Sequence, residues 1–168
     1  MQFENLSLRL ESDILLTQKL KPFDFDGTVD THELELRMTA LMQAYNGMGI
    51  AANQVGFDQR VIVVQPKGQT PIGMFNPEII SQSGVCTDEE GCLSFPGLFI
   101  KVERSDNITV NYLDKDQKSC TITLTGMDAK CVQHEIDHLD GICFITKVSR
   151  LKLDLARKRQ RKYNGRTK

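Results

Sequence analysis

Two histidines four residues apart are the strongest chemical signal in this 168-residue sequence. The segment His134-Glu135-Ile136-Asp137-His138 is an HExxH pattern, and helical spacing places both imidazoles on one face. Two such rings can bind one metal ion, while Glu135 between them reaches a water molecule beside that ion. An incidental pair of surface histidines is the weaker alternative, because the surrounding segment is apolar at helical spacing. We therefore expect a catalytic metal site on a helix.

A catalytic site of this kind needs a third protein ligand, and the sequence narrows the choice. Position 144, where an HExxHxxGxxH pattern would carry another histidine, is Phe144, and no Glu follows Glu135. The only other histidine, His32, lies at the opposite end of the chain. A cysteine or an upstream carboxylate remains. Cys92 is the favoured cysteine, because Gly91 beside it permits an irregular backbone that can aim a thiolate and a neighbouring amide at one target.

The other cysteines are expected to pack as small apolar side chains. They are Cys86, Cys120, Cys131 and Cys143. Five cysteines without a CxxC pair favour a reducing compartment over a disulfide framework. The longest aliphatic run, 61–64, is too short to cross a membrane, and the first fifteen residues do not resemble a secretory signal. We therefore expect a cytoplasmic location and no membrane association.

A segment rich in glycine precedes these motifs. Gly47-x-Gly49-x-x-Ala52 superficially fits a dinucleotide fingerprint, but it follows an expected helix instead of a strand, and no acid occurs in 60–75 to hold a ribose. An extended segment after a helix stop is the better interpretation. Glycines there let a peptide approach the backbone closely, and Gln54 offers a neutral amide donor.

The elements that must position these residues follow from apolar periodicity. Helical spacing predicts helices over 31–46, 127–140 and 149–162. Short β-branched or apolar runs predict strands over 60–65, 71–80, 108–113 and 119–124, the last two as a hairpin. Because strands and helices do not alternate as βαβ units, the expected class is α+β, with antiparallel strands packed around a central HExxH helix and a C-terminal helix.

Composition and charge suggest one domain with a basic end. With 40% hydrophobic and 26% charged residues, the chain is typical of a folded globular protein. No linker divides it, so we expect a single catalytic domain over 1–149 and a basic helix or tail over 150–168. Residues 147–168 hold ten Lys or Arg and one acid, so the formal charge of this segment is +9. Because the net charge of the chain is −1, the remaining residues carry a charge of −10. Such a tail favours an anionic partner, most often nucleic acid, although a solvated helix end is the alternative.

Three segments, in order, resemble the signature motifs of peptide deformylases. They are Gly47-Met48-Gly49-Ile50-Ala51-Ala52-Asn53-Gln54, Glu90-Gly91-Cys92-Leu93-Ser94 and Gln133-His134-Glu135-Ile136-Asp137-His138. The resemblance extends from about residue 40 to 146. It implies metal-dependent hydrolysis of the N-formyl group from the N-terminal formylmethionine of newly made polypeptides, with release of formate.

The resemblance also implies a role for each motif residue. Metal ligands would be Cys92, His134 and His138. Glu135 would accept the proton of the attacking water and return it to the departing amine, while the Gln54 amide and the Leu93 backbone N–H would stabilise the oxyanion. The methionine pocket and the contacts to the peptide backbone would come from Met48, Gly49, Glu90, Gly91 and Cys131. Arg104 would support the cysteine loop through an ion pair with Glu90.

A thiolate with two imidazoles suits Fe2+, Zn2+, Ni2+ or Co2+, and the resemblance favours Fe2+. The expected partners of a monomeric enzyme are N-formylmethionyl nascent peptides and, through the basic tail, ribosomal RNA. Asp137 is expected either to orient an imidazole or to face solvent. Two departures from the family pattern are Phe99, where many bacterial members have Arg, and the absence of a His-Pro-Asp segment near the start.

Two other functions stay open on the residues alone. One is a zinc peptidase that cleaves internal peptide bonds. The other is a binding module, in which a closed structural zinc site supports a basic arm on RNA.

Overall fold

The computed structural model describes residues 6–164. Among them lie three α-helices: α1 (Thr31–Ala44), α2 (Gly126–Leu139) and α3 (Arg150–Asn164). The strands are β1 (Gly49–Ala51), β2 (Val61–Val64), β3 (Ile72–Ser83), β4 (Cys86–Cys92), β5 (Phe95–Arg104), β6 (Asn107–Leu113) and β7 (Ser119–Thr125). Single-turn 3-10 helices are η2 (Ile14–Thr17), η3 (Ala52–Val55) and η4 (Phe144–Lys147).

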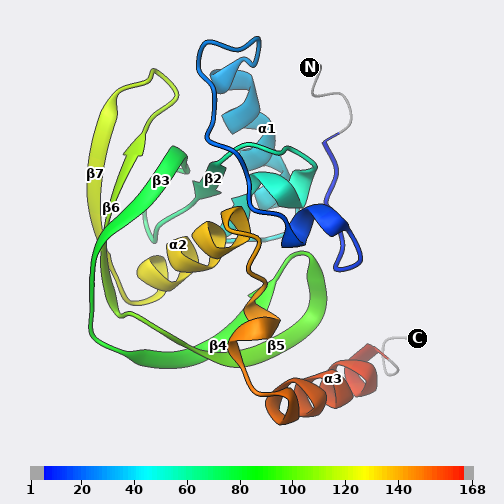
Figure 1. The fold of residues 1–168 in the computed structure, drawn as a ribbon. Helices are drawn as coiled ribbons and strands as arrows, with labels where there is room; N and C mark the ends of the chain where they lie inside the picture. Colours follow the sequence, from blue (N-terminus) through cyan, green and yellow to red (C-terminus); the bar gives the residue numbers. More distant parts are fainter. Residues whose placement is uncertain (1–5, 165–168) are drawn as a thin grey trace.

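The strands form two antiparallel sheets. One has five strands in the order β1-β2-β3-β6-β7, and the other is the pair β4-β5. Figure 1 shows α2 in the middle of the molecule, with β6 and β7 on one side and β4 and β5 below it. Separate helices combined with antiparallel sheets confirm the expected α+β class.

Helices α1 and α2 cover opposite faces of the first sheet. Gly49 faces α2, because a Cβ atom on it would meet Cys131 and Glu135. Gly73, on β3, faces α1 in the same way, through Glu35. Strand β2 between them is buried along its whole length, as four consecutive aliphatic residues require when both faces of a strand are covered. The helix that carries HExxH therefore packs on a part of the sheet that is covered on both faces.

The three predicted helices are present, with ends within about two residues of the expected ones. Asp30 caps α1, because its side chain accepts a hydrogen bond from the Glu33 backbone N–H. Gly141 follows α2 with a φ of 73°, a left-handed conformation that glycine adopts without strain. Within residues 6–164, no helix combines the length and the apolar character needed to cross a membrane.

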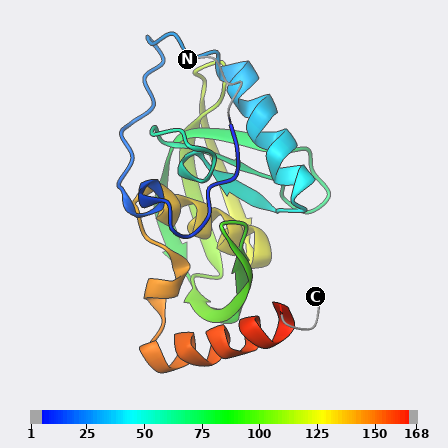
Figure 2. The same cartoon turned by 90° about the vertical axis from the view of Figure 1, so that its right-hand side faces the viewer.

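A second, smaller core joins α3 to the rest of the molecule. Leu98 and Ile100 of β5 and Phe144 of η4 are buried together with Ala156 of α3. The side chain of Gln160 also donates a hydrogen bond to the Pro96 carbonyl oxygen at 2.7 Å. The turned view in Figure 2 shows α1 and α3 at opposite ends of the molecule, with α2 between them.

Candidate metal centre

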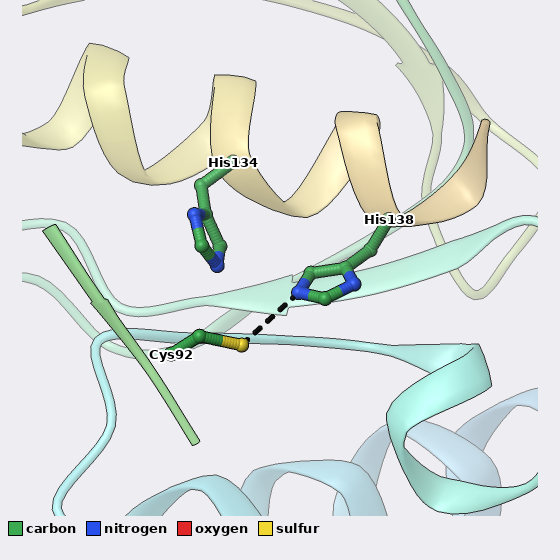
Figure 3. A group of neighbouring side chains, drawn as sticks. All are labelled: Cys92, His134 and His138. Atoms are coloured by element: carbon green, nitrogen blue, oxygen red, sulfur yellow. Dashed lines mark hydrogen bonds between the residues drawn. The ribbon is translucent and has the colours of Figure 1, made fainter. Parts of the chain in front are cut away.

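Three ligating side chains meet beside α2. The ligand atoms of Cys92, His134 and His138 lie within 4.8 Å of one another. The Cys92 sulfur is 3.2 Å from Nε2 of His138, and the His134 ring points toward the same sulfur (Figure 3). A thiolate and two imidazoles are a common ligand set for first-row transition metals. Three protein ligands leave one coordination position open, which is typical of catalytic sites.

Two separate elements place these ligands. The histidines stand one turn apart on α2, as the HExxH spacing predicts. Cys92 ends β4, where the pairing with β5 shifts register between Gly91 and Cys92. This bulge matches the irregular backbone expected beside Gly91, and the Cys92 sulfur points toward the His138 ring (Figure 3).

Hydrogen bonds of the buried motif residues fix α2 against its neighbours. Asn53 donates through Nδ2 to the His138 carbonyl oxygen at 2.6 Å, which ties η3 to the end of the helix. Gln133 accepts from the Ser105 N–H at 3.0 Å and donates to the Ser105 carbonyl at 2.8 Å. These two motif residues therefore tie the helix to η3 and to the turn between β5 and β6, a role that their positions in the motifs do not reveal.

The orientation of the His134 ring is set by Glu90. His134 Nδ1 lies 3.1 Å from Glu90 Oε2, and because a carboxylate can only accept, Nδ1 donates and Nε2 remains for a metal ion. Burial would raise the pKa of Glu90, but hydrogen bonds from His134 and Arg104 outweigh it and lower the pKa to about 2. Glu90 is therefore an ionised acceptor at neutral pH.

Arg104 forms the expected ion pair with Glu90 and a second one that the sequence does not reveal. Its Nε and Nη2 donate to the two Glu90 oxygens at 2.7 Å and 3.0 Å. Its Nη1 donates to Asp137, which also accepts from Nζ of Lys147 at 2.9 Å. Asp137 thus neither orients an imidazole directly nor faces free solvent. A chain of charges runs from Lys147 through Asp137, Arg104 and Glu90 to His134.

The surroundings of the two imidazoles favour one positive charge between them. Burial lowers the pKa of His138 well below its usual value, so this ring is neutral. Burial also acts against a charge on His134, but hydrogen bonds with Cys92 and Glu90 outweigh it and raise the pKa of His134 to about 10. The thiol and the carboxylate therefore favour positive charge at this point, which a divalent metal ion also supplies.

Glu135 is buried next to the ligands, and one of its two carboxylate oxygens is not engaged in a hydrogen bond with the described residues. Its side chain is 4% exposed, and within residues 6–164 its Oε2 has no hydrogen-bond partner. Such an orphaned acceptor in a cavity wall is free to bind a water or a substrate group. Burial raises the pKa of Glu135 to about 7, which suits a group that must accept and then release a proton near neutral pH.

Gln54 presents its amide N–H2 to the site. Its oxygen accepts from the Ala51 N–H at 2.8 Å, which fixes which way the amide faces. Its Nε2 donates to Ser94 Oγ at 3.2 Å and to Cys92 Sγ at 3.4 Å. The Cys92 sulfur therefore receives a hydrogen bond from an amide whose orientation is fixed.

A cavity of about 570 Å3 opens onto these groups. Five of the six expected substrate-binding residues line it, namely Met48, Gly49, Glu90, Gly91 and Cys131, and Leu93, Gln54, Cys92, His134 and Glu135 line it as well. Arg104 does not. It lies behind Glu90 and lines a separate polar cleft instead, so the structure places it as a support of the cysteine loop, away from the cavity that would receive a substrate.

Two of the cysteines differ from the expected apolar packing. Cys86 begins β4 and is only half-buried. It has polar neighbours, since its thiol donates to the Asp88 carboxylate at 3.3 Å and accepts from Lys130. Cys120 is half-buried on β7, the last strand of its sheet. Cys143 is buried in the second core, as expected. Burial raises the pKa of the half-buried Cys131 well above its usual value, so that it remains a thiol in the cavity wall.

Sequence reasoning missed several residues of the site. Ser94 shares the Gln54 amide with Cys92, and its place in the cysteine motif was the available signal. Tyr45, Phe99 and Met127 line the cavity from three different elements. No local pattern predicts this meeting, because it depends on how α1, β5 and α2 pack together.

Comparisons with known proteins agree with this geometry. The family model described as polypeptide deformylase matches residues 8–154. A peptide deformylase of Thermodesulfovibrio yellowstonii is 43% identical over 134 residues, which cover 77% of this chain and 81% of that protein. One of Agrobacterium fabrum is 41% identical over 138 residues, covering 78% and 81%.

Solved structures give the same result. The crystal structure of a peptide deformylase from Legionella pneumophila superposes with a TM-score of 0.87 at 34% identity, covering 96% of each chain. That of Synechococcus elongatus, in complex with actinonin, gives 0.84 at 32% identity, covering 92% of this chain and 87% of that one. Motifs, fold and relatives thus lead to one conclusion: the chain belongs to the polypeptide deformylase family of hydrolases, which remove the formyl group from nascent peptides.

Proposed function

We propose that this chain hydrolyses the formyl amide of N-formylmethionyl polypeptides at the Cys92, His134 and His138 site and releases formate. The observation that carries the proposal is the grouping of these three ligand atoms at the wall of one cavity, which Cys92, His134 and Glu135 line. Glu135 has there an oxygen without a hydrogen-bond partner among residues 6–164. A closed structural zinc site has no use for a carboxylate beside the metal ion, so this arrangement favours catalysis over a purely structural role.

The bound metal ion supplies Lewis-acid chemistry, because it polarises a carbonyl and makes water more acidic. Cys92, His134 and His138 would hold it. The donor set suits Fe2+, Zn2+, Ni2+ and Co2+, and Fe2+ is the proposed ion because of the family resemblance. Both Fe2+ and a ligating thiolate are sensitive to oxygen, so activity must be assayed on protein prepared without air.

The chain's own residues perform the remaining steps. Glu135 holds the proton taken from the attacking water and passes it to the amine that leaves as the new N-terminus. The Gln54 amide and the Leu93 backbone N–H donate to the oxygen of the formyl group as it gains negative charge, with roughly 3 kcal/mol expected for one well-placed donor. The methionine side chain would occupy the cavity beside Gly49 and Cys131.

A paired assay tests the proposed reaction. Iron-loaded protein is incubated with a formyl-methionyl tripeptide, and formate and free amine are measured together. The same protein is then offered a longer unformylated peptide. Equimolar formate and amine from the first substrate, with no fragments from the second, is the expected result. Fragments of the second peptide without formate from the first would identify a peptidase and reject the proposal.

Arg104→Lys is expected to weaken metal binding by about 10- to 100-fold, a typical effect for a residue that supports a metal ligand. Lysine cannot make the two parallel hydrogen bonds to Glu90, so Glu90 would hold the His134 ring less firmly. The dissociation constant for Co2+, followed by the visible absorption of the bound ion, measures the effect. Arg37→Lys is the matched control, because Arg37 also donates through two N–H groups to a carboxylate, that of Glu33 on α1, away from the ligands. Equal Co2+ affinity in the Arg104 variant would contradict this role.

Gly49→Ala is expected to lower kcat by about 10- to 100-fold, because a displacement of about 1 Å in a catalytic group has effects of this size. A Cβ atom at position 49 would lie 2.6 Å from Glu135 Oε1 and 2.7 Å from Cys131 Sγ, so Glu135 must move. Formate release under saturating peptide measures the loss. Gly27→Ala, at an exposed turn, is the control and should match wild type. An unchanged kcat in the Gly49 variant would show that Glu135 tolerates displacement.

We also propose that the basic segment 150–168 is a tail that contacts ribosomal RNA, beside a catalytic unit formed by 1–149. A groove of about 540 Å3 between α3 and the β4–β5 pair supports this, because Lys101, Lys152, Lys158, Arg159 and Lys162 line it around Ile100 and Leu155. Such a concentration of positive charge attracts phosphate backbones.

The unpaired cysteines favour a reducing cytoplasm, and we infer a monomer acting there on nascent chains.

Deleting α3 would uncover the second core, so charge reversal is the cleaner test of the tail. The variant carries Glu at Lys152, Lys158 and Lys162, and it should co-sediment with ribosomes less than wild type at low salt. A control with Glu at the exposed Lys19, Lys67 and Lys118 has the same net charge. Equal loss in both variants, or in neither, would reject a specific role for the tail.

A further inference from the structure

Large apolar side chains surround the mouth of the cavity at the proposed active site. Tyr45, Met48, Phe99 and Met127 line this cavity, and each is 43–54% exposed. Single exposed apolar residues are ordinary on a protein surface, but a group of them around one cavity indicates a binding surface.

The polar groups lie at the opposite, inner end of the same cavity. Gln54, His134 and Glu135 are all buried, whereas the rim residues are open to solvent. When the reacting group of a substrate lies at the inner end, the rest of the substrate must therefore extend out of the cavity across the apolar rim. In a formylmethionyl polypeptide, the residues that cross the rim are those directly after the methionine.

Phe99 is a rim residue whose position the β4–β5 pairing fixes. It pairs across the two strands with Gly91, and a Cβ atom on Gly91 would lie only 2.6 Å from Phe99 Cε1. The ring thus packs against the Gly91 backbone, next to Cys92, and keeps its other face in solvent. This open face lies close to the proposed active site, and it offers a flat apolar surface to a side chain of the bound peptide.

The charged residues of the cavity do not provide a competing preference. Glu90 is paired with Arg104, and Lys130 is paired with Asp88. Glu89 lies directly opposite Lys101 in the β4–β5 register, so that their charges offset each other. The rim therefore discriminates by apolar contact more than by charge.

We propose that Phe99 makes this enzyme select formylated peptides with an apolar side chain directly after the methionine. The proposal rests on the proposed function, since it concerns the substrate of the same site. An apolar side chain at that position would leave water by covering the Phe99 ring, whereas a small polar one would gain little.

Two peptides that differ only in the residue after formylmethionine, Phe or Ser, test the preference. Wild-type kcat/KM is expected to be about tenfold higher for the Phe peptide, mostly through KM, which is within the range for added apolar contact in a binding site. Phe99→Ala should reduce this ratio to about twofold, and Phe99→Leu should retain most of it. Ile80→Ala is the matched control, because Ile80 is as exposed as Phe99 but does not line the cavity.

Equal kcat/KM for both peptides in wild type would overturn the inference and leave the proposed function intact. A tenfold ratio that persists in Phe99→Ala would also overturn it, because another surface would then make the selection. Formate release from neither peptide would reject the proposed function and the inference together. The ratio is independent of how much of each variant is folded, so partial loss of protein does not affect the result.

Discussion

Replacing Glu135 by Gln should reduce kcat by about 10³-fold while one metal ion per chain remains bound. The isosteric amide keeps the volume of a side chain that is 4% exposed, but it cannot accept a proton from water. General base and acid catalysis contributes roughly 10² to 10⁴ in rate, so its loss accounts for an effect of this size. Formate release under saturating peptide and metal analysis of the same sample measure both parts of the prediction.

The metal measurement separates the two explanations for a loss of activity. Glu135 is not among the three grouped ligands, so Cys92, His134 and His138 remain complete in the variant. Glu103→Gln, which alters an exposed carboxylate on β5, is a control for the loss of one negative charge and should retain activity. An active Glu135→Gln enzyme would show that another group moves the proton.

Replacing Cys92 by Ala should abolish both metal binding and activity. The variant removes the thiolate, and it also leaves the Gln54 amide without one of its two acceptors. We expect at least a 10³-fold loss of formate release and less than about 0.1 metal ion per chain at low micromolar metal, because two imidazoles alone bind such ions far more weakly than a three-ligand site.

Cys120→Ala is the matched control for this experiment. Cys120 is a half-buried cysteine on β7, away from the cavity, so its loss should change neither metal content nor activity. Full metal content in Cys92→Ala would mean that another side chain completes the site. The upstream carboxylate that the sequence leaves open would then be the first alternative.

The residues that local periodicity governs were predictable. Helix α2 follows from apolar spacing, and once it is a helix, the proximity of His134 and His138 follows from its geometry. The hairpin of β6 and β7 and the glycine that ends α2 follow from equally local signals. The same reasoning could name Cys92 only as the favoured cysteine, since its distance from α2 depends on the whole fold.

The β4–β5 pair shows why the rest could not be predicted. Asp88, Glu89 and Glu90 in β4 are poor strand formers, so the segment has no propensity signal. Its strand structure comes from the pairing with β5, where Leu98, Ile100 and Val102 alternate toward the core. This alternation has a period of two in the sequence, yet the predicted strands do not include 95–104.

Contacts between distant residues were also beyond the sequence. Arg104 and Asp137 are separated by 33 positions, and their ion pair exists because β5 packs beside α2. Only then does Lys147, from η4, complete the charge chain that ends at His134. The spacing of residues within a motif says nothing about such partners. This is why Asp137 was expected to face either an imidazole or solvent.

The most direct test of the account is a titration of metal-free protein with Fe2+ in the absence of oxygen, followed by formate release from a formyl-methionyl peptide. For wild type, we predict that activity rises linearly and saturates at one ion per chain. Glu135→Gln should bind the same amount of Fe2+ and remain inactive. Formate release from wild-type protein without added metal, or saturation far from one ion per chain, would contradict a single metal centre at Cys92, His134 and His138.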